Sequence, residues 1–255
     1  MRQVPGLAVE TIAPRAVRVR LERPPVNALS SELYAGLTDV LGDLADRGEI
    51  SCILLGSALD DPFCAGADLK EIAAAGDDPR HGQQRAQLAR RLFQTVLELP
   101  VPTVAVVTGQ ALGAGCVLAT LCDLRVAAPP ASFRLPEIDV GLLGGFRHVA
   151  RLLPQGAARY MSLTGRGLSA EDAHRLGMVE FVAEDSATAW AMAEDIAADI
   201  AAKDPTAIRL AKRAIVDSEE LSLDSGYRVE QSYTAQLRGG AGVALSRSWK
   251  DRRGG

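Results

Sequence analysis

Gly109-Gln-Ala-Leu-Gly-Ala-Gly-Cys116 is a glycine-bearing turn, and a second one, Phe63-Cys-Ala-Gly-Ala-Asp-Leu-Lys70, lies earlier in the chain. Each turn follows an apolar run, Val104 to Val107 and Cys52 to Leu55, so each is predicted to lead from a buried strand into a helix. The first amides of a helix have no partner within the helix, and the helix dipole favours negative charge there. Together the turns predict two backbone N–H groups that stabilise one oxyanion, such as an enolate.

Four motifs follow one another in a set order, and the turns are two of them. The motifs are Arg23-Pro-Pro-Val-Asn-Ala-Leu29, Phe63 to Glu71, Gly109 to Asp123, and Phe133-Arg-Leu-Pro-Glu-Ile-Asp-Val-Gly141. In order and spacing they resemble the enoyl-CoA hydratase/isomerase (crotonase) family, and four ordered motifs are far more specific than a single glycine pattern.

The resemblance implies a fold, a substrate class and an assembly. The fold would be α/β: a crotonase-like spiral of ββα repeats over residues 1–200, followed by a C-terminal helical region, 201–255, that oligomerises and covers the pocket. The substrate would be an acyl-CoA thioester, as in fatty acid metabolism, and coenzyme A would be part of the substrate rather than a cofactor. The assembly would be a homotrimer or homohexamer.

Composition and charge exclude other classes of protein. The chain has 255 residues, 47% of them apolar, and a net charge of −4, which argues against a nucleic-acid surface. Its four cysteines show no metal-ligand spacing, so we expect reduced thiols, no metal or redox cofactor and a cytoplasmic location. The uncharged stretch from Leu99 to Cys122 is long enough to span a bilayer, but its prolines and glycines favour a buried strand, turn and helix. We expect no membrane partner.

Periodicity and turn signals predict the remaining elements. Strands are expected at 7–11, 16–21, 52–56, 124–127 and 132–133, and helices at 31–45, 84–98, 147–153, 156–163, 170–176, 186–203 and 205–218. Asp68 is expected to open a helix, and residues 73–81, with their Gly, Asp and Pro, are predicted to form a mobile loop.

Family positions assign roles to the residues of the two turns. The resemblance places the oxyanion donors at the N–H groups of Ala67 and Ala114. It places the other substrate contacts at Val26, Ala28, Ala65, Gly66, Asp68, Leu69, Gly113 and Val117. The alternative is that Gly113 and Gly115 merely allow the helix to pack tightly against the sheet.

Proton transfer needs a carboxylate or a histidine beside the thioester. The resemblance places one catalytic glutamate at Glu137, whose apolar surroundings would raise its pKa. The second glutamate of the family's hydratases would fall at Val117, which can neither hold a water molecule nor deliver a proton. One carboxylate still suits isomerisation of a 3-enoyl to a 2-enoyl thioester, an atypical hydration or a decarboxylation. A non-catalytic acyl-CoA-binding protein is the alternative.

For other polar residues, a structural role is favoured over a catalytic one. His148 could replace the missing acid, but the interpretation we favour is that Arg147 and His148 face solvent on a helical turn. Asp68, Asp123 and Asp139 are expected to act as caps or in hydrogen bonds. The resemblance makes Lys250 a candidate for binding a CoA phosphate. The glycines match neither a dinucleotide fingerprint nor a phosphate-binding loop, and no GxSxG elbow occurs in the sequence.

Overall fold

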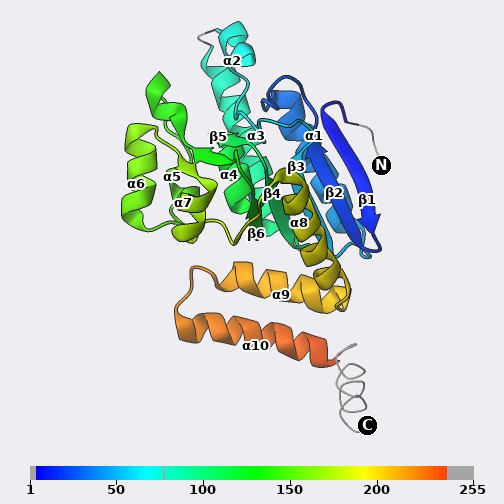
Figure 1. Cartoon of the computed structure of the whole chain (residues 1–255). Coiled ribbons are helices and arrows are strands. Elements are labelled where there is room, and N and C mark those ends of the chain that lie inside the picture. Colours follow the sequence, from blue (N-terminus) through cyan, green and yellow to red (C-terminus); the bar gives the residue numbers. More distant parts are fainter. Residues whose placement is uncertain (1–3, 77, 240–255) are drawn as a thin grey trace.

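A computed structural model of the chain describes residues 4–76 and 78–239, and its central layer is a six-stranded sheet (Figure 1). The strand order is β1-β2-β3-β4-β6-β9, with β1 antiparallel to β2 and every other pair parallel. The strands are β1 (Leu7–Ala13), β2 (Ala16–Leu21), β3 (Cys52–Ser57), β4 (Thr103–Val107), β6 (Leu124–Ala127) and β9 (Phe181–Val182). A smaller sheet contains β5 (Gln110–Leu112), β7 (Ser132–Arg134) and β8 (Leu168–Ser169).

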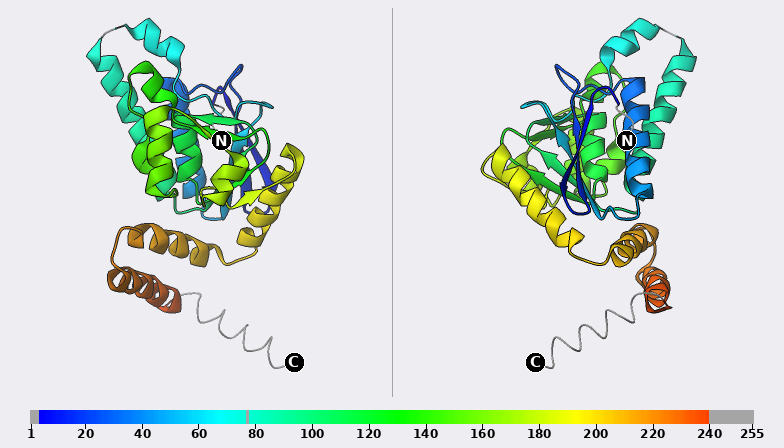
Figure 2. Two further views of the ribbon diagram at one scale, coloured as in Figure 1. Left: turned by 60° about the vertical axis from the view of Figure 1, so that its left-hand side comes forward. Right: turned by 90° about the vertical axis from the view of Figure 1, so that its right-hand side faces the viewer.

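Helices cover both faces of the large sheet, which explains why its strands are continuously apolar. Ile53 and Leu55 of β3 point to the core shared with α1 (Ser31–Asp46), α3 (Pro79–Glu98) and α4 (Ala114–Leu121). Cys52 and Leu54 point to the opposite face, where they pack against the buried alanines of α8 (Ser186–Ala201). The right-hand view of Figure 2 shows the strands between α8 (yellow) and α1 (blue).

One predicted loop is wrong. The described residues at both ends of the segment 73–81 are helical, because α2 (Leu69–Ala75) runs through its first part and α3 begins at Pro79. Asp78 caps α3 by accepting a hydrogen bond from the Arg80 N–H at 2.9 Å. The Asp-Pro pair that suggested a turn is instead an N-cap followed by a proline at the first helical position.

The segment after β7 is made of short elements. It contains a 3₁₀ helix η1 (Pro136–Val140), α5 (Phe146–Val149), α6 (Gln155–Thr164) and α7 (Ala170–Arg175). The helix predicted for 147–153 is therefore a single turn at 146–149. The sequence did not predict η1, β5, β8 or β9, which are too short to show a hydrophobic period.

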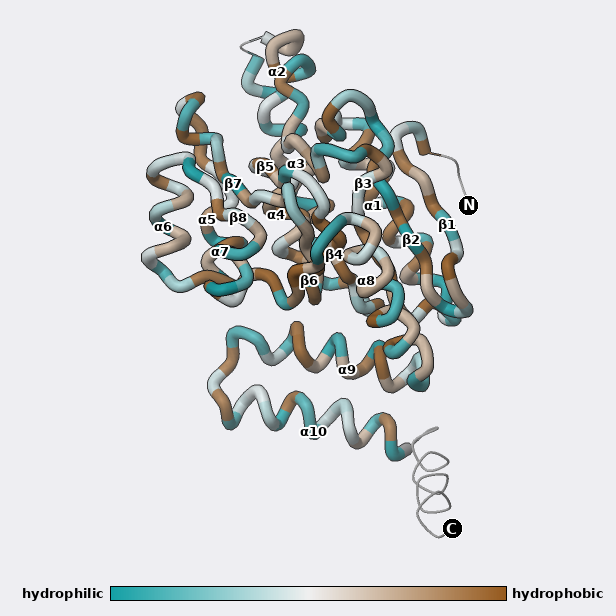
Figure 3. The backbone as a smooth tube through the Cα atoms, in the orientation of Figure 1, coloured by the Kyte–Doolittle hydropathy of each residue, from teal (hydrophilic) through white to brown (hydrophobic). Residues whose placement is uncertain are grey.

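Two helices at the C-terminal end lie beyond the edge of the core. Helix α9 (Pro205–Ser218) confirms the prediction for 205–218, while α10 (Leu223–Gly239), which packs along α9, was expected only as part of the helical region 201–255, without bounds of its own. Both helices lie below the sheet in Figures 1 and 2, and in Figure 3 they alternate between hydrophilic and hydrophobic residues. Several apolar side chains here are exposed: Ile215, Leu221, Leu223 and Tyr227.

The uncharged stretch from Leu99 to Cys122 forms β4, β5 and α4, as the strand, turn and helix interpretation predicts. None of the helices within residues 4–76 and 78–239 is long and apolar enough to cross a membrane.

Candidate active site

The two glycine-bearing turns meet in the structure. Cys64 and Ala111 form a parallel bridge, with hydrogen bonds from Cys64 N to Gln110 O (3.1 Å) and from Leu112 N to Cys64 O (2.9 Å). Gly115, in the first turn of α4, packs directly on this bridge: a Cβ at Gly115 would lie only 2.4 Å from the Cys64 carbonyl oxygen. The turns are thus held together by backbone contact, which only glycine permits at this point.

The amides expected to bind an oxyanion lie where the turns meet. Gly66 has a left-handed φ of +87°, and a Cβ on it would lie 3.3 Å from the Ala114 nitrogen. Ala67 follows Gly66, and Ala114 is the first residue of α4. Neither the Ala67 nor the Ala114 N–H donates a hydrogen bond to any residue in the described part of the chain. The structure therefore brings together two free backbone donors from separate segments.

The segment Val26–Ala28 borders the first turn. The Ala65 N–H donates to the Val26 carbonyl at 3.0 Å, and Leu29 forms a parallel bridge with Ala67. Asn27, fully buried with φ +50°, fixes this arrangement by donating from Nδ2 to the Phe63 carbonyl at 3.1 Å. The predicted contact residues Val26, Ala28, Ala65, Gly66 and Leu69 thus lie along one edge of the site.

Asp68 caps a helix, as predicted. Its carboxylate accepts hydrogen bonds from the N–H groups of Lys70 (2.9 Å) and Glu71 (3.2 Å) and pairs with Arg23 at 2.7 Å. Burial raises the pKa of Asp68, but these hydrogen bonds outweigh burial and the net pKa is lowered. Its oxygens are occupied, so Asp68 holds the first turn in place and is not placed to transfer protons.

Glu137 is the one predicted catalytic carboxylate near the amides. It lies on η1, and its oxygens pack against glycines on both sides: a Cβ at Gly113 would lie 2.7 Å from Oε1, and one at Gly144 would lie 2.5 Å from Oε2. Oε2 is buried and has no hydrogen-bond partner among residues 4–76 and 78–239. Burial raises the pKa of Glu137 above its ordinary value. A half-buried, unpaired carboxyl group with a raised pKa suits acid–base chemistry.

Val117 occupies the position where the resemblance places a second glutamate. It is buried on α4, and a Cβ at Gly145 would lie only 2.1 Å from its Cγ2. The turn Gly144–Gly145 therefore packs on Val117 with one glycine and on Glu137 with the other. No carboxylate at 117 complements Glu137.

Tyr34, Phe93 and His148 form an aromatic row beside this turn that the sequence did not predict. The ring centroids of Tyr34 and Phe93 are 6.5 Å apart, and those of Phe93 and His148 are 5.6 Å apart, both edge to face. His148 is half-buried, so the favoured prediction that it faces solvent is wrong, whereas Arg147 is exposed and pairs with Glu220 as that prediction expects. In the sequence, the consecutive glycines 144 and 145 are the feature that indicates close packing at this turn.

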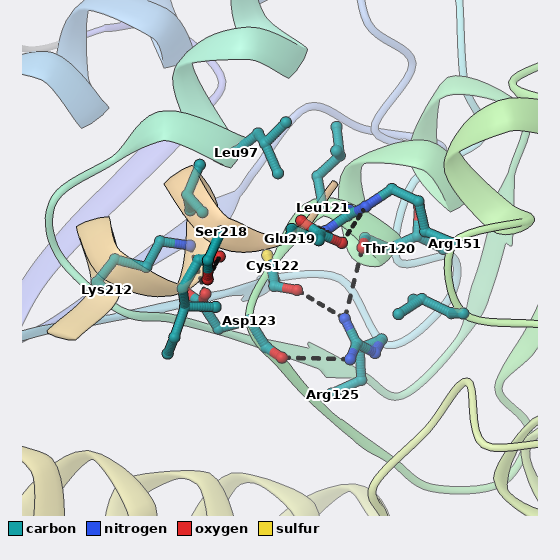
Figure 4. Close-up of a pocket in the computed structure, with 13 residues that line it drawn as sticks. Leu97, Thr120, Leu121, Cys122, Asp123, Arg125, Arg151, Lys212, Ser218 and Glu219 are labelled. Atoms are coloured by element: carbon teal, nitrogen blue, oxygen red, sulfur yellow. Dashed lines mark hydrogen bonds and ion pairs between the residues drawn. The ribbon is translucent and has the colours of Figure 1, made fainter. Parts of the chain in front are cut away.

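The other acidic candidates lie outside this site. Asp139 is exposed and pairs with Arg134 at 2.6 Å, a local role as predicted. Asp123 borders a cavity of about 350 Å³ between the end of α4 and α9 (Figure 4). It accepts hydrogen bonds from the N–H (2.8 Å) and hydroxyl (3.0 Å) of Thr103 and pairs with Lys212, which is 4% exposed. Asp123 therefore has the hydrogen-bonding role predicted for it, at a partly buried position.

The described residues show no metal-binding cluster. Within 4–76 and 78–239, no group of three or more His, Cys, Asp or Glu side chains could hold a metal ion. All four cysteines are free and buried, and burial raises the pKa of each thiol, for example to about 12 at Cys64. Lys250 lies outside the described residues.

Comparison with known proteins identifies the family. The sequence pattern of the family described as Enoyl-CoA hydratase/isomerase matches residues 13–239. A putative enoyl-CoA hydratase/isomerase from Bacillus subtilis is 36% identical over 217 residues, covering 84% of this chain and 82% of the relative. A (7aS)-7a-methyl-1,5-dioxo-2,3,5,6,7,7a-hexahydro-1H-indene-carboxyl-CoA hydrolase from Rhodococcus jostii is 35% identical and covers 91% of this chain and 89% of its own length.

A solved structure supports the same family and shows the same fold. The crystal structure of an enoyl-CoA hydratase from Bacillus anthracis superposes with a TM-score of 0.91 at 31% identity, covering 97% of this chain and 96% of the other. This confirms the predicted crotonase-like α/β fold with its C-terminal helices. The chain belongs to the enoyl-CoA hydratase/isomerase family of enzymes.

Proposed function

We propose that this protein stabilises the enolate of an acyl-CoA thioester between the N–H groups of Ala67 and Ala114, with Glu137 as the acid–base group. The observation that carries the proposal is the meeting of two unpaired backbone donors and one unpaired, half-buried carboxyl group. Each donor aimed at the developing oxyanion is worth about 3–4 kcal/mol of transition-state stabilisation. A carboxyl group with a raised pKa can take and return a proton at a carbon beside the thioester carbonyl.

Val117 limits the set of reactions that this site is able to catalyse. With a single carboxyl group, the reaction supported best is isomerisation of a 3-enoyl to a 2-enoyl thioester, in which Glu137 removes a proton from C2 and returns it to C4. An atypical hydration is the second candidate, because the relatives from Bacillus are named as hydratases or as hydratase/isomerases. The hydrolase names of the Rhodococcus and Mycobacterium relatives extend the candidates to hydrolysis of a cyclic acyl-CoA.

The experiment that tests the proposal is proton NMR of the protein with 3-hexenoyl-CoA in D₂O, alongside Glu137→Gln. The expected result is the appearance of the conjugated 2-enoyl signal, lost in the variant. Binding of the thioester without conversion would favour the alternative, a non-catalytic acyl-CoA-binding protein. A variant that retains full activity would refute the role of Glu137.

We also propose that the protein is a homotrimer or homohexamer held by α9 and α10, and that it is cytoplasmic. The exposed apolar side chains on these helices support a contact between copies, and the four buried thiols suit a reducing compartment. Light scattering coupled to gel filtration tests the assembly. The reaction as proposed requires no cofactor beyond the coenzyme A of the substrate.

A further inference from the structure

We propose that His148 is a second acid–base residue of this site, and that it acts on water in place of the carboxylate that Val117 does not provide. The proposal rests on the function proposed above and deepens it. It adds water to the reaction: a 2-enoyl thioester would be hydrated by Glu137 and His148 together. Glu137 acting alone would only isomerise.

The position of His148 carries the first part of the argument. His148 lies on α5 and reaches back to the turn Gly144–Gly145, where a Cβ at Gly145 would lie 3.3 Å from its Nδ1 and 2.1 Å from Val117 Cγ2. The imidazole and the Val117 methyl group therefore adjoin the same point. The preceding glycine makes the close contact with Glu137. One turn thus packs on the Glu137 carboxyl group, on Val117 and on the His148 imidazole.

The hydrogen bonding of the ring carries the second part. Nδ1 is buried and has no hydrogen-bond partner among the described residues. A neutral imidazole carries one N–H and one lone pair, so Nε2 accepts a proton in the tautomer with hydrogen on Nδ1. Nε2 has no partner among the described residues. Phe93 packs against the ring edge to face and restricts its rotation.

The surroundings keep the imidazole neutral. Burial is the largest cause that lowers the pKa of His148, followed by the charges of Arg151 and Arg147. These arginines are paired with acids that follow α9, Arg151 with Glu219 and Arg147 with Glu220. Phe93 from α3 packs edge to face on the ring, and Val117 from α4 adjoins the same point at Gly145. A neutral imidazole at pH 7 is able to accept a proton.

The step balances with water as the only co-reactant. As the water oxygen bonds to C3 of the enoyl thioester, its proton passes to Nε2, and the π electrons move onto the thioester oxygen at the two amides. The protonated Glu137 then donates its proton to C2, and the C=O bond re-forms. The imidazolium returns its proton to the Glu137 carboxylate through solvent, which restores both groups.

The test compares two reactions across three variants. Hydration of 2-hexenoyl-CoA is followed by loss of the conjugated absorbance, and isomerisation of 3-hexenoyl-CoA by NMR, in wild type, His148→Gln, Glu137→Gln and the exposed-histidine control His81→Gln. We expect His148→Gln to lower kcat for hydration by roughly 10²–10⁴-fold with little change in KM, because loss of a positioned acid–base group has this effect. Isomerisation should fall far less than hydration in His148→Gln, because it depends on Glu137 alone, and His81→Gln, at an exposed position, should change neither reaction.

The pH profile and chemical rescue separate catalysis from a packing role. In wild type, kcat for hydration should fall at acid pH as the imidazole takes up a proton, and this limb should be absent in His148→Gln and in the smaller His148→Asn. Free imidazole should restore hydration in His148→Ala. Hydration that survives His148→Gln, an acid limb that persists, or a wild type that adds no water would overturn the proposal. Isomerisation that survives Glu137→Gln would instead refute the proposed function.

Discussion

Replacing Gly144 with alanine should move the Glu137 carboxylate without disturbing the fold. A Cβ at this position would lie 2.5 Å from Oε2 and 2.9 Å from Cδ of Glu137, whereas ordinary van der Waals contact begins at 3.4 Å. The carboxylate must therefore shift by about 1 Å, a displacement that can cost roughly 10²-fold in rate when a catalytic group is misplaced. The side chain is free to give way at its far end, so the cost in unfolding free energy should stay below about 1 kcal/mol.

The assay measures kcat/KM for 3-hexenoyl-CoA isomerisation together with urea unfolding. We expect Gly144→Ala to lose about 10²-fold in kcat/KM at nearly unchanged stability. Gly42→Ala is the matched control, because nothing lies within 4 Å of a Cβ at that helical position, and it should gain about 0.5–1 kcal/mol with activity unchanged. A Gly144→Ala protein as active as wild type would show that the carboxylate does not work from the position seen here.

Three further predictions concern the glycine turn, Glu137 and the separate Lys212–Asp123 pair. Gly145→Ala should destabilise the protein by about 1–3 kcal/mol, because the added methyl group clashes with Val117. In a double-mutant cycle measured by urea unfolding, Val117→Ala should recover at least about 1 kcal/mol of this loss. Additive effects of the two substitutions would contradict the contact between positions 145 and 117. Because the pKa of Glu137 is raised in the folded state, ionisation of this carboxyl group opposes folding as pH rises. Glu137→Gln should therefore be more stable than wild type at pH 7 but not near pH 4, where both proteins carry a neutral group at this position. A difference in melting temperature that does not change with pH would count against this. Lys212→Met removes the buried partner of the partly exposed Asp123 carboxylate, which keeps its hydrogen bonds from Thr103, and should cost about 1–3 kcal/mol of unfolding free energy, a loss that a fully exposed pair would not show.

The sequence predicted the parts of the fold that depend on local chemistry. The strand from Cys52, the cap at Asp68 and the helix that begins at Ala114 each follow from an apolar run beside a recognised capping or turn residue, and each is present. The Asp78-Pro79 pair shows the limit of the same reasoning. A cap and a loop use the same residue types, and only the helix that follows distinguishes them.

Contacts between distant segments were harder to predict. The resemblance placed Ala67, Ala114 and Glu137 in one site, but the residues alone did not place His148 beside Val117, because that contact depends on how the turn after η1 folds back. Nor does residue type reveal that Phe93 in α3 packs against the imidazole. Such contacts depend on long-range packing, which no local period encodes.

The valine at position 117 therefore bears differently on function once its neighbours are known. A valine alone indicates a site that has lost its second proton donor and retains one-carboxylate chemistry. Here Val117 contacts a glycine turn that also packs on the half-buried imidazole of His148. This arrangement indicates that α5, rather than α4, provides the second acid–base group. The two cases differ in one respect, whether water takes part in the reaction. Chemistry in this family is thus better inferred from the set of unpaired polar atoms around the two amides than from the residue at any single position.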